Sequence, residues 1–400
     1  MVRDFRSAVM AGLLMVTVLA AQAQWELGGQ IRYRFESSNR DFHQDTKASN
    51  VNLLRSRLNV TLSAAENVTG FFQLQDSRTF GEETWTMDGD ADQMDLHQGF
   101  IHFTDLLHAP IDLKVGRMEV IYGPERLIGA VGWSNVGRSF DGAVLKLRQQ
   151  RFTTDLFYFK EKEVELPRDS LDTNVQGIYA DLNLVNNHTT QAFLIRQQTI
   201  DRRNIYTTGL YVKGEIGPVA HEIEAAYQFG EQNPPHELSY SAYLVAINLS
   251  YSLSRLPLQP MLSAGIDYLS GDDDIMDNTS KVFYTMYATN HKYYGYMDYF
   301  ITIAPSTLHL GLTDIHGKVS LQPLEHTKLH LAYHIFRASQ SYGTGDKDFL
   351  QELDLTLNYS YTSNVSMVGG ASLAWPGEIF KSRRGSDMAT WLYLMTVVNF

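Results

Sequence analysis

The chain has 400 residues and no cysteine, which excludes disulfide and thiol chemistry. Its formal net charge of −12 argues against a general nucleic-acid binder, so we expect no nucleic-acid partner. The mean hydropathy of −0.23 is too low for a bundle of transmembrane helices.

The first residues have the pattern of a secretory signal peptide. Arg3 and Arg6 precede an apolar run over residues 8–21, which is too short to span a bilayer as a helix. The run ends in Ala-Gln-Ala, a small-x-small cleavage pattern. We therefore expect residues 1–23 to be removed and residues 24–400 to form the mature protein.

Most of the mature sequence alternates between apolar and polar residues, the period of a β-strand with one apolar face. In the first segment Leu27, Ile31 and Tyr33 share one face, and Arg32 and Arg34 share the other. Many segments are longer than the roughly 5–6 residues of typical soluble strands and reach the 9–11 that a membrane strand needs. We count eighteen of them, approximately at 25–36, 50–63, 68–78, 95–104, 110–118, 140–148, 152–161, 173–184, 189–198, 205–214, 219–230, 240–251, 259–270, 313–322, 326–337, 349–361, 364–375 and 388–400.

The connections between these segments alternate in length. Short turns such as 64–67 and 217–218 separate long loops, which lie near 37–49, 79–94, 119–139, 271–312, 338–348 and 376–387. In bacterial outer-membrane barrels, short turns at one end of the barrel alternate along the chain with long loops at the other end. A soluble β-sandwich does not require this alternation. We therefore expect an all-β fold, a transmembrane antiparallel β-barrel of about 18 strands in outer-membrane lipid. An even strand count puts both termini on the short-turn, periplasmic side.

The last segment, TWLYLMTVVNF, ends the chain at Phe400. Every second residue counted back from Phe400 lies on the same face of this strand, and that face is almost wholly apolar. An apolar face must contact protein or lipid. This ending resembles the terminal strand of outer-membrane barrels, which closes against the first strand. We expect the barrel assembly machinery to recognise it.

Many basic residues fall on the face opposite the apolar one. A charge that faces lipid at mid-membrane costs about 2–4 kcal/mol, so these side chains must point into the lumen or lie near a membrane surface. Guanidinium groups on a narrow wall also focus a positive potential and bind carboxylates in a fork. The pore-lining or anion-binding candidates are Arg32, Arg34, Arg55, Arg57, Arg78, Arg117, Arg126, Arg138 and Lys146.

Two alternatives remain open for this basic face. Some arginines could form structural ion pairs with Glu36, Asp76 or Asp141. In addition, carboxylates in the later strands also fall on the inward face, which would permit a neutral or zwitterionic solute; they are Glu222, Glu224, Glu352 and Asp354.

The longest loop, 271–312, carries candidates for recognition, namely Tyr284, Tyr287, Tyr293, Tyr294 and Tyr296. They could stack on sugar rings at the mouth, fold inward as a constriction, or pack the loop against its neighbours. The loop opens with three consecutive aspartates, a poor match to a calcium loop, so the sequence favours a solvated acidic turn and no metal site.

No HExxH, GxSxG or phosphate-loop motif occurs. We therefore expect no catalytic residues, no cofactor and no enzymatic activity.

The stretch from Val115 to Gly142 carries a specific resemblance. Its pieces include Gly116-Arg117, Tyr122-Gly123, Arg126-Leu127-Ile128-Gly129, Trp133, Arg138-Ser139 and Phe140-Asp141-Gly142. With residues 54–58 and 73–78, this stretch resembles the alginate export family of outer-membrane proteins. The resemblance implies an eighteen-stranded, monomeric barrel with a basic lumen for anionic polysaccharide. The predicted function is a passive channel for an anionic oligo- or polysaccharide or a small anion. Alternatives are a plugged barrel that acts as an adhesin or scaffold, or a hydrolase carried by a barrel.

Overall fold

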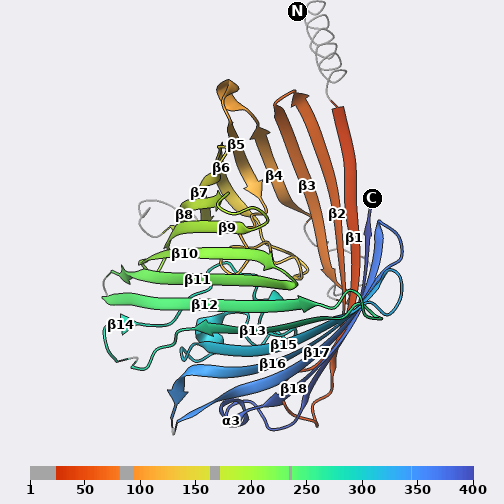
Figure 1. Ribbon diagram of the computed structural model, residues 1–400, viewed down its shortest axis with the longest axis vertical. Coiled ribbons are helices and arrows are strands. Elements are labelled where there is room, and N and C mark those ends of the chain that lie inside the picture. The colour runs from red at the N-terminus through yellow and green to blue at the C-terminus, as the bar shows by residue number, and fades with distance from the viewer. Residues whose placement is uncertain (1–23, 82–93, 163–171, 234–236, 275, 344) are drawn as a thin grey trace, which may run out of the picture.

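The computed structural model describes residues 24–81, 94–162, 172–233, 237–274, 276–343 and 345–400, so the expected signal peptide lies outside the described residues. Within these ranges, eighteen long strands form a closed antiparallel β-barrel (Figure 1). Strand β1 (Gln24–Asn39) pairs with β2 (Ser49–Ala65) on one side and β19 (Ala389–Asn399) on the other, which closes the ring. The predicted fold class and strand number are therefore confirmed.

Each long strand pairs with its neighbours along the chain. The two-residue strand β14 (Thr279–Ser280) is an addition that pairs in parallel with β12. The remaining strands are β3 (Val68–Thr79), β4 (Asp95–Phe103), β5 (Ile111–Met118), β6 (Phe140–Arg148), β7 (Phe152–Lys162), β8 (Thr173–Leu182), β9 (Thr189–Gln198), β10 (Arg203–Ile216), β11 (Val219–Gln232), β12 (Leu238–Ser252), β13 (Met261–Leu269), β15 (Leu312–Leu321), β16 (Thr327–Tyr342), β17 (Asp346–Ser360) and β18 (Val365–Pro376). The short helices are η1 (Leu106–His108), η3 (Asn290–Lys292), α2 (Ile303–Ser306) and α3 (Glu378–Lys381).

The outer face of the barrel is apolar. Large side chains that alternate along the strands, such as Leu27, Leu210 and Leu394, are each more than half exposed. The alternate residues of each strand point inward. On β1 these include Arg32 and Arg34, which are buried. An outward belt of Leu, Ile, Val and aromatic residues is what a lipid bilayer requires of a barrel. Among the described residues, no helix is long and apolar enough to span a membrane.

Short turns lie at one end of the barrel and most long loops at the other. One expected long loop, 338–348, is wrong, because β16 continues to Tyr342 and β17 starts at Asp346. The two strands stay paired there, with Tyr342 opposite Asp346 after register shifts. Gln24, the first described residue, and Phe400 lie at the short-turn end, where the amide of Gly29 donates to the carbonyl of Phe400 at 2.8 Å.

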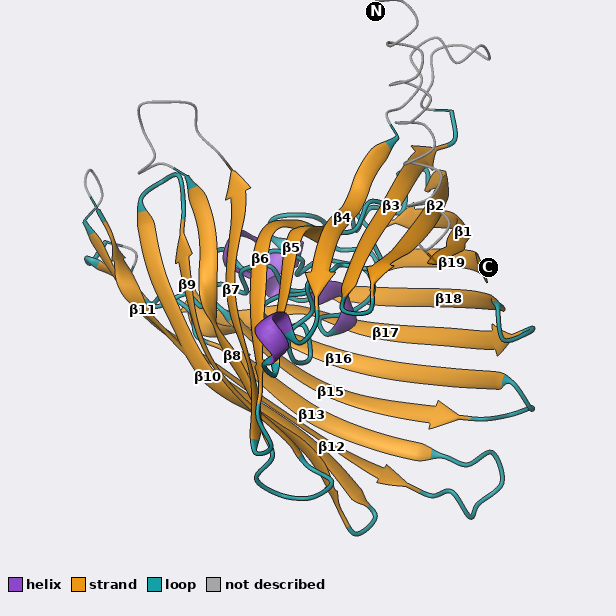
Figure 2. Ribbon diagram, turned by 90° about the horizontal axis from the view of Figure 1, so that it is seen from above, coloured by secondary structure: helices purple, strands orange, loops and turns teal. Residues whose placement is uncertain are grey.

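The buried core of the protein lies inside the ring of strands. Two long connections fold into it: residues 119–139 between β5 and β6, and residues 281–311 between β14 and β15 (Figure 2). We call them the first and the second inner loop. The fully buried Phe300 of the second inner loop packs on Phe336 of β16 and Phe349 of β17, with ring centroids 4.7 and 5.5 Å apart. The barrel interior is therefore filled in part by its own loops.

Candidate functional site

The two inner loops are joined to each other by backbone hydrogen bonds. The amide of Gly129 donates to the carbonyl of Tyr287 at 2.9 Å, and the amide of Tyr287 donates to the carbonyl of Leu127 at 2.9 Å. The amide of Thr289 donates to the carbonyl of Glu125, also at 2.9 Å. The loops thus form one body within the lumen, and the candidate site is built where this body meets the barrel wall.

The first inner loop is held to the wall by arginines of β1. Arg32 donates to the carbonyl oxygens of Gly132 at 2.7 Å and Ser134 at 2.8 Å. Arg34 donates to the carbonyl of Trp133 at 2.6 Å. Both arginines are 4% exposed. They point inward as predicted, but they bind backbone carbonyls of the loop.

Two more predicted arginines, on β2, belong to the same wall. Arg55 donates to the carbonyl oxygens of Gly132 at 3.3 Å and Ser134 at 3.1 Å. Arg57 forms an ion pair with Glu119 at 3.1 Å and lies 2.9 Å from His97 Nε2. A carbonyl is neutral, so these hydrogen bonds occupy the donors of Arg32, Arg34 and Arg55 without removing their charge.

The structural ion pairs left open by the sequence are present. Arg34 lies 2.7 Å from Glu36, and Arg78 lies 2.7 Å from Asp76. The more exposed Arg117 lies 3.7 Å from Asp141.

The other pore candidate on a strand, Lys146, is 3.5 Å from Asp155, and its side chain is 43% exposed. Arg138 donates to the carbonyls of Gly129 and Tyr287, so it joins the two inner loops.

Arg126 is the most deeply engaged of the predicted residues. It comes from the first inner loop, forms an ion pair with Asp267 of β13, and lies 3.4 Å from Glu224 of β11. Its guanidinium stacks 3.7 Å from the ring centre of Tyr293. Burial opposes the charge of Arg126, but Asp267 and the groups around it raise its pKa overall.

Inward carboxylates of β17 hold the second inner loop. The amide of Met297 donates to Glu352 at 2.8 Å, and the amide of Tyr296 donates to Asp354 at 3.4 Å. Both carboxylates are at most 1% exposed. The basic wall therefore binds loop carbonyls and the acidic wall binds loop amides, which gives a structural role to both signs of charge on the inward face.

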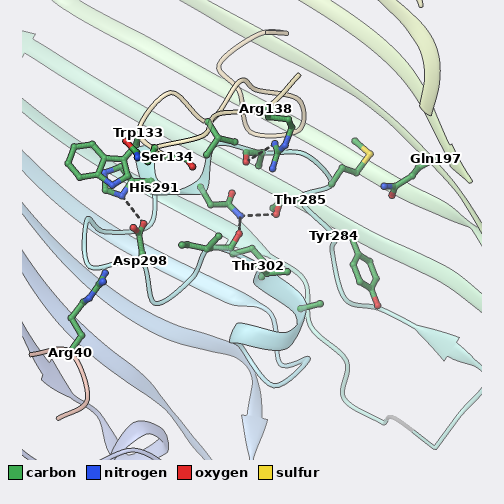
Figure 3. A pocket seen from close by; sticks show the side chains of 18 of the residues that line it. Arg40, Trp133, Ser134, Arg138, Gln197, Tyr284, Thr285, His291, Asp298 and Thr302 are labelled. Atoms are coloured by element: carbon green, nitrogen blue, oxygen red, sulfur yellow. Dashed lines mark hydrogen bonds and ion pairs between the residues drawn. The ribbon is translucent and has the colours of Figure 1, made fainter. Parts of the chain in front are cut away.

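A cavity of about 550 Å³ lies on the long-loop side of the inner loops (Figure 3). Arg40, Arg138 and Arg203 line it with Arg34, against the carboxylates of Glu36 and Asp298. The rest of the lining is rich in amide and hydroxyl side chains: Asn135, Gln197, Thr199, Thr285, Asn290 and Thr302. We call this space the outer cavity.

A second cavity, of about 640 Å³, lies on the short-turn side, and we call it the inner cavity. It is lined by strand residues near the short turns, such as Asn358 and Met395, and by Lys292 and Tyr296 of the second inner loop.

Trp133 and His291 line both cavities and separate them. Their rings are stacked, with centroids 4.4 Å apart and planes 12° apart (Figure 3). His291 Nδ1 lies 2.7 Å from Asp298, and the guanidinium of Arg34 lies 4.0 Å over the ring of Trp133. We call Trp133 and His291 the ring pair, because their side chains line both cavities.

The predicted tyrosines are distributed between these features. Tyr284 lines the outer cavity, and Tyr296 lines the inner cavity and stacks on His291 with centroids 5.2 Å apart. Tyr287, Tyr293 and Tyr294 pack inside the loop body, where burial raises the pKa of Tyr293. The second inner loop thus lies inside the barrel, and these three tyrosines pack it against its neighbours.

Sequence reasoning missed Arg40, Arg203, His291 and Asp298. Alternation could have found the two arginines, because Arg40 continues the inward face of Arg32 and Arg34, and Arg203 shares a face with the buried Ile205. His291 and Asp298 had no local signal, because they lie in a loop with no strand period.

Comparisons with known proteins agree with this architecture. No curated protein sequence matches the chain. Among solved structures, OpdO of Pseudomonas aeruginosa is similar with a TM-score of 0.62 at 14% identity, over 94% of this chain and 97% of the other. OccAB4 of Acinetobacter baumannii gives 0.61 at 10% identity, over 94% and 98%. OpdK of Pseudomonas aeruginosa, solved with vanillate, gives 0.59 at 13% identity, over 94% and 98%.

These structures share the barrel fold with this chain. The sequence profile described as "Alginate export" matches residues 23–393, which is nearly the whole length. The protein is an integral outer-membrane β-barrel, and it belongs to the alginate export family.

Proposed function

We propose that the barrel is a passive channel for small anionic solutes, including acidic saccharides, which cross between the outer and inner cavities past the ring pair. The observation that carries this proposal is the lining of the outer cavity. Arg34, Arg40, Arg138 and Arg203 outnumber Glu36 and Asp298 there. Charges of one sign in a narrow, low-dielectric space raise the local concentration of the opposite ion.

The arginines that hold the first inner loop add to this field. Arg32 and Arg55 donate to neutral carbonyls, so their positive charge persists behind the loop. The amide and hydroxyl groups of the outer cavity supply the donors and acceptors that a sugar ring requires. The family description, alginate export, and the vanillate reported with OpdK are consistent with acidic solutes.

The volumes of the two cavities limit the size of the solute. Volumes of about 550 and 640 Å³ fall in the range of about 300–1,000 Å³ typical of small-molecule pockets. Each cavity therefore suits a short oligosaccharide or a single small anion. A longer chain would have to pass the ring pair one residue at a time.

We also propose an orientation for the barrel. Short turns of bacterial barrels face the periplasm, and the same orientation here puts both termini in the periplasm and the outer cavity towards the cell exterior. We further propose that the barrel is a monomer in outer-membrane lipid and that its assembly machinery recognises the strand ending in Phe400.

The second candidate is a plugged barrel that serves as an adhesin or scaffold. The inner loops and the closed ring pair favour it, because they fill the section between the two cavities. A plugged barrel would conduct no steady current in a planar bilayer. The hydrolase alternative would instead require turnover of a saccharide with the passage blocked.

Ion selectivity tests the channel proposal. The purified barrel in a planar bilayer under a salt gradient should show an anion-selective reversal potential. Arg40→Gln with Arg203→Gln should shift that potential towards cations, most strongly near 0.01 M salt, where the Debye length is about 30 Å. The matched control, Arg255→Gln with Arg337→Gln, removes two exposed arginine charges outside the cavity.

Each outcome of this experiment is decisive. A folded wild-type barrel without conductance would reject the channel and support the plugged barrel. Conductance with equal shifts in both double variants would reject the outer cavity as the source of selectivity.

A further inference from the structure

Three side chains of the kinds that bind metal ions lie close together on the lumen face of β15 and β16, away from both cavities. Asp314 and His316 lie two residues apart on β15, and His334 is paired with His316 on β16. All three side chains are at most 6% exposed. Their candidate ligand atoms lie within 4.8 Å of one another.

The two distances from Asp314 to the histidines are close to those between neighbouring ligands of one metal ion. Asp314 Oδ2 lies 2.9 Å from His334 Nδ1 and 3.2 Å from His316 Nδ1. A first-row divalent ion binds histidine nitrogen and carboxylate oxygen at about 2.1 Å, so neighbouring ligand atoms are about 3.0 Å apart in an octahedral site and about 3.4 Å apart in a tetrahedral one. Two histidines and one carboxylate on one face are a known ligand set for such ions.

The backbone beside the cluster fixes which nitrogen of His316 is presented. Gly265 of β13 lies opposite His316, and a Cβ at this position would come within 2.4 Å of His316 Nε2. Glycine leaves room for the imidazole to lie against β13. Nε2 therefore faces the neighbouring backbone, and Nδ1 faces Asp314.

Buried charge on the surrounding wall also favours a cation. Five buried carboxylates line it: Glu224, Asp267, Asp314, Glu352 and Asp354. Arg126 pairs with two of them, and Lys318, two residues after His316 on the same face of β15, adds a second positive charge. Since an uncompensated buried charge is costly, a divalent ion would compensate the fully buried carboxylate of Asp314.

We propose that Asp314, His316 and His334 bind one first-row divalent metal ion in the wall of the lumen. The ion is structural: it compensates the buried charge of Asp314 and ties β15 to β16. It reaches the cluster before the second inner loop docks, because the cluster is buried in the folded barrel.

Cobalt absorbance tests the site. The chain is refolded into detergent after chelation with a tenfold excess of Co²⁺, then freed of unbound ion. The wild-type barrel should retain one equivalent of Co²⁺ with a visible d–d band, and Zn²⁺ added during refolding should displace it. His316→Gln and His334→Gln should each lose the bound equivalent. His330→Gln is the matched control, because His330 lies on the same face of β16 and binds Ser320 instead.

A wild-type barrel that retains no cobalt would overturn the proposal, and the cluster would then be a hydrogen-bonded triad. Equal retention by His334→Gln, checked for folding by heat-modifiable migration, would also overturn it. Anomalous diffraction from Zn²⁺-refolded wild-type crystals covers the case in which both histidine variants fail to fold. Anomalous density among the three ligand atoms supports the site, and its absence there rejects it.

Discussion

At the scale of single residues, Arg126 shows how the lumen is stabilised. Its guanidinium is buried with Asp267 and Glu224 and links the first inner loop to β11 and β13. Removal of one partner from a buried ion pair leaves an unpaired charge, which is far costlier than loss of a surface pair.

We predict that Arg126→Met lowers the free energy of unfolding by about 3–5 kcal/mol, because Asp267 and Glu224 would remain buried without their cation. The control is Lys146→Met, which removes a half-exposed pair with Asp155 and should cost below about 1 kcal/mol. Urea titration in lipid vesicles, followed by tryptophan fluorescence, measures both. Equal midpoints for the two variants would contradict this assignment.

In the proposed channel, solutes pass the ring pair. Trp133→Ala should raise single-channel conductance, because it removes the indole that separates the two cavities. The backbone of the loop should stay in place, since Arg34 binds the carbonyl of residue 133 and that carbonyl is kept in alanine. Trp375→Ala, which removes a part-exposed indole from β18, is the control and should leave conductance unchanged.

Unaltered conductance in a folded Trp133→Ala barrel would mean that solutes take another route or that the lumen is plugged elsewhere.

At the scale of elements, β19 completes the barrel. Ten residue pairs join it to β1, and Phe400 exchanges backbone hydrogen bonds with Gly29. The ring of Phe400 lies against that glycine: a Cβ at position 29 would meet the ring at 2.5 Å. The last residue is therefore both part of the seam and part of the outward apolar face.

We expect Phe400→Asp to reduce insertion into the outer membrane while secretion to the periplasm continues. A carboxylate on the outward face of the closing strand would face lipid or the assembly machinery. Membrane yield by fractionation, compared with Asn399→Asp as a neighbouring control, measures the effect. Full membrane yield of Phe400→Asp would show that this residue carries no assembly signal.

At the scale of the whole molecule, closure removes every edge strand from the long sheet. The seam between β1 and β19 has a continuous register from Gln30 to Asn39. Without an edge, detergent has no free strand from which to begin unravelling the sheet. The inner loops add a second set of cross-links between opposite walls.

The mature chain should therefore migrate faster in SDS gels before boiling than after, with a β-sheet circular-dichroism spectrum in micelles. A helical spectrum or identical migration would contradict the closed barrel. Arg32→Gln with Arg55→Gln should keep this behaviour, because these arginines hold the first inner loop and not the strand ladder.

The sequence by itself determined the barrel, its strand number and the inward placement of Arg32, Arg34 and Arg55. Side-chain direction along a strand has a period of two, so each segment carries its own orientation, and the bilayer excludes charge from the outer face. Local sequence motifs also indicated the family, because each motif is a short run of residues that can be recognised without the fold. The error at residues 338–348 arose where polar residues continue a strand beyond the membrane.

Only the tertiary structure decided what the inward charges contact. Arg32 and Gly132 are 100 residues apart, and Arg126 and Asp267 are 141 apart. The inner loops that join them follow no strand period, so their path depends on the walls they meet. The pairing of Trp133 with His291, and of Asp314 with two histidines, arises only when distant segments enclose the same small volume.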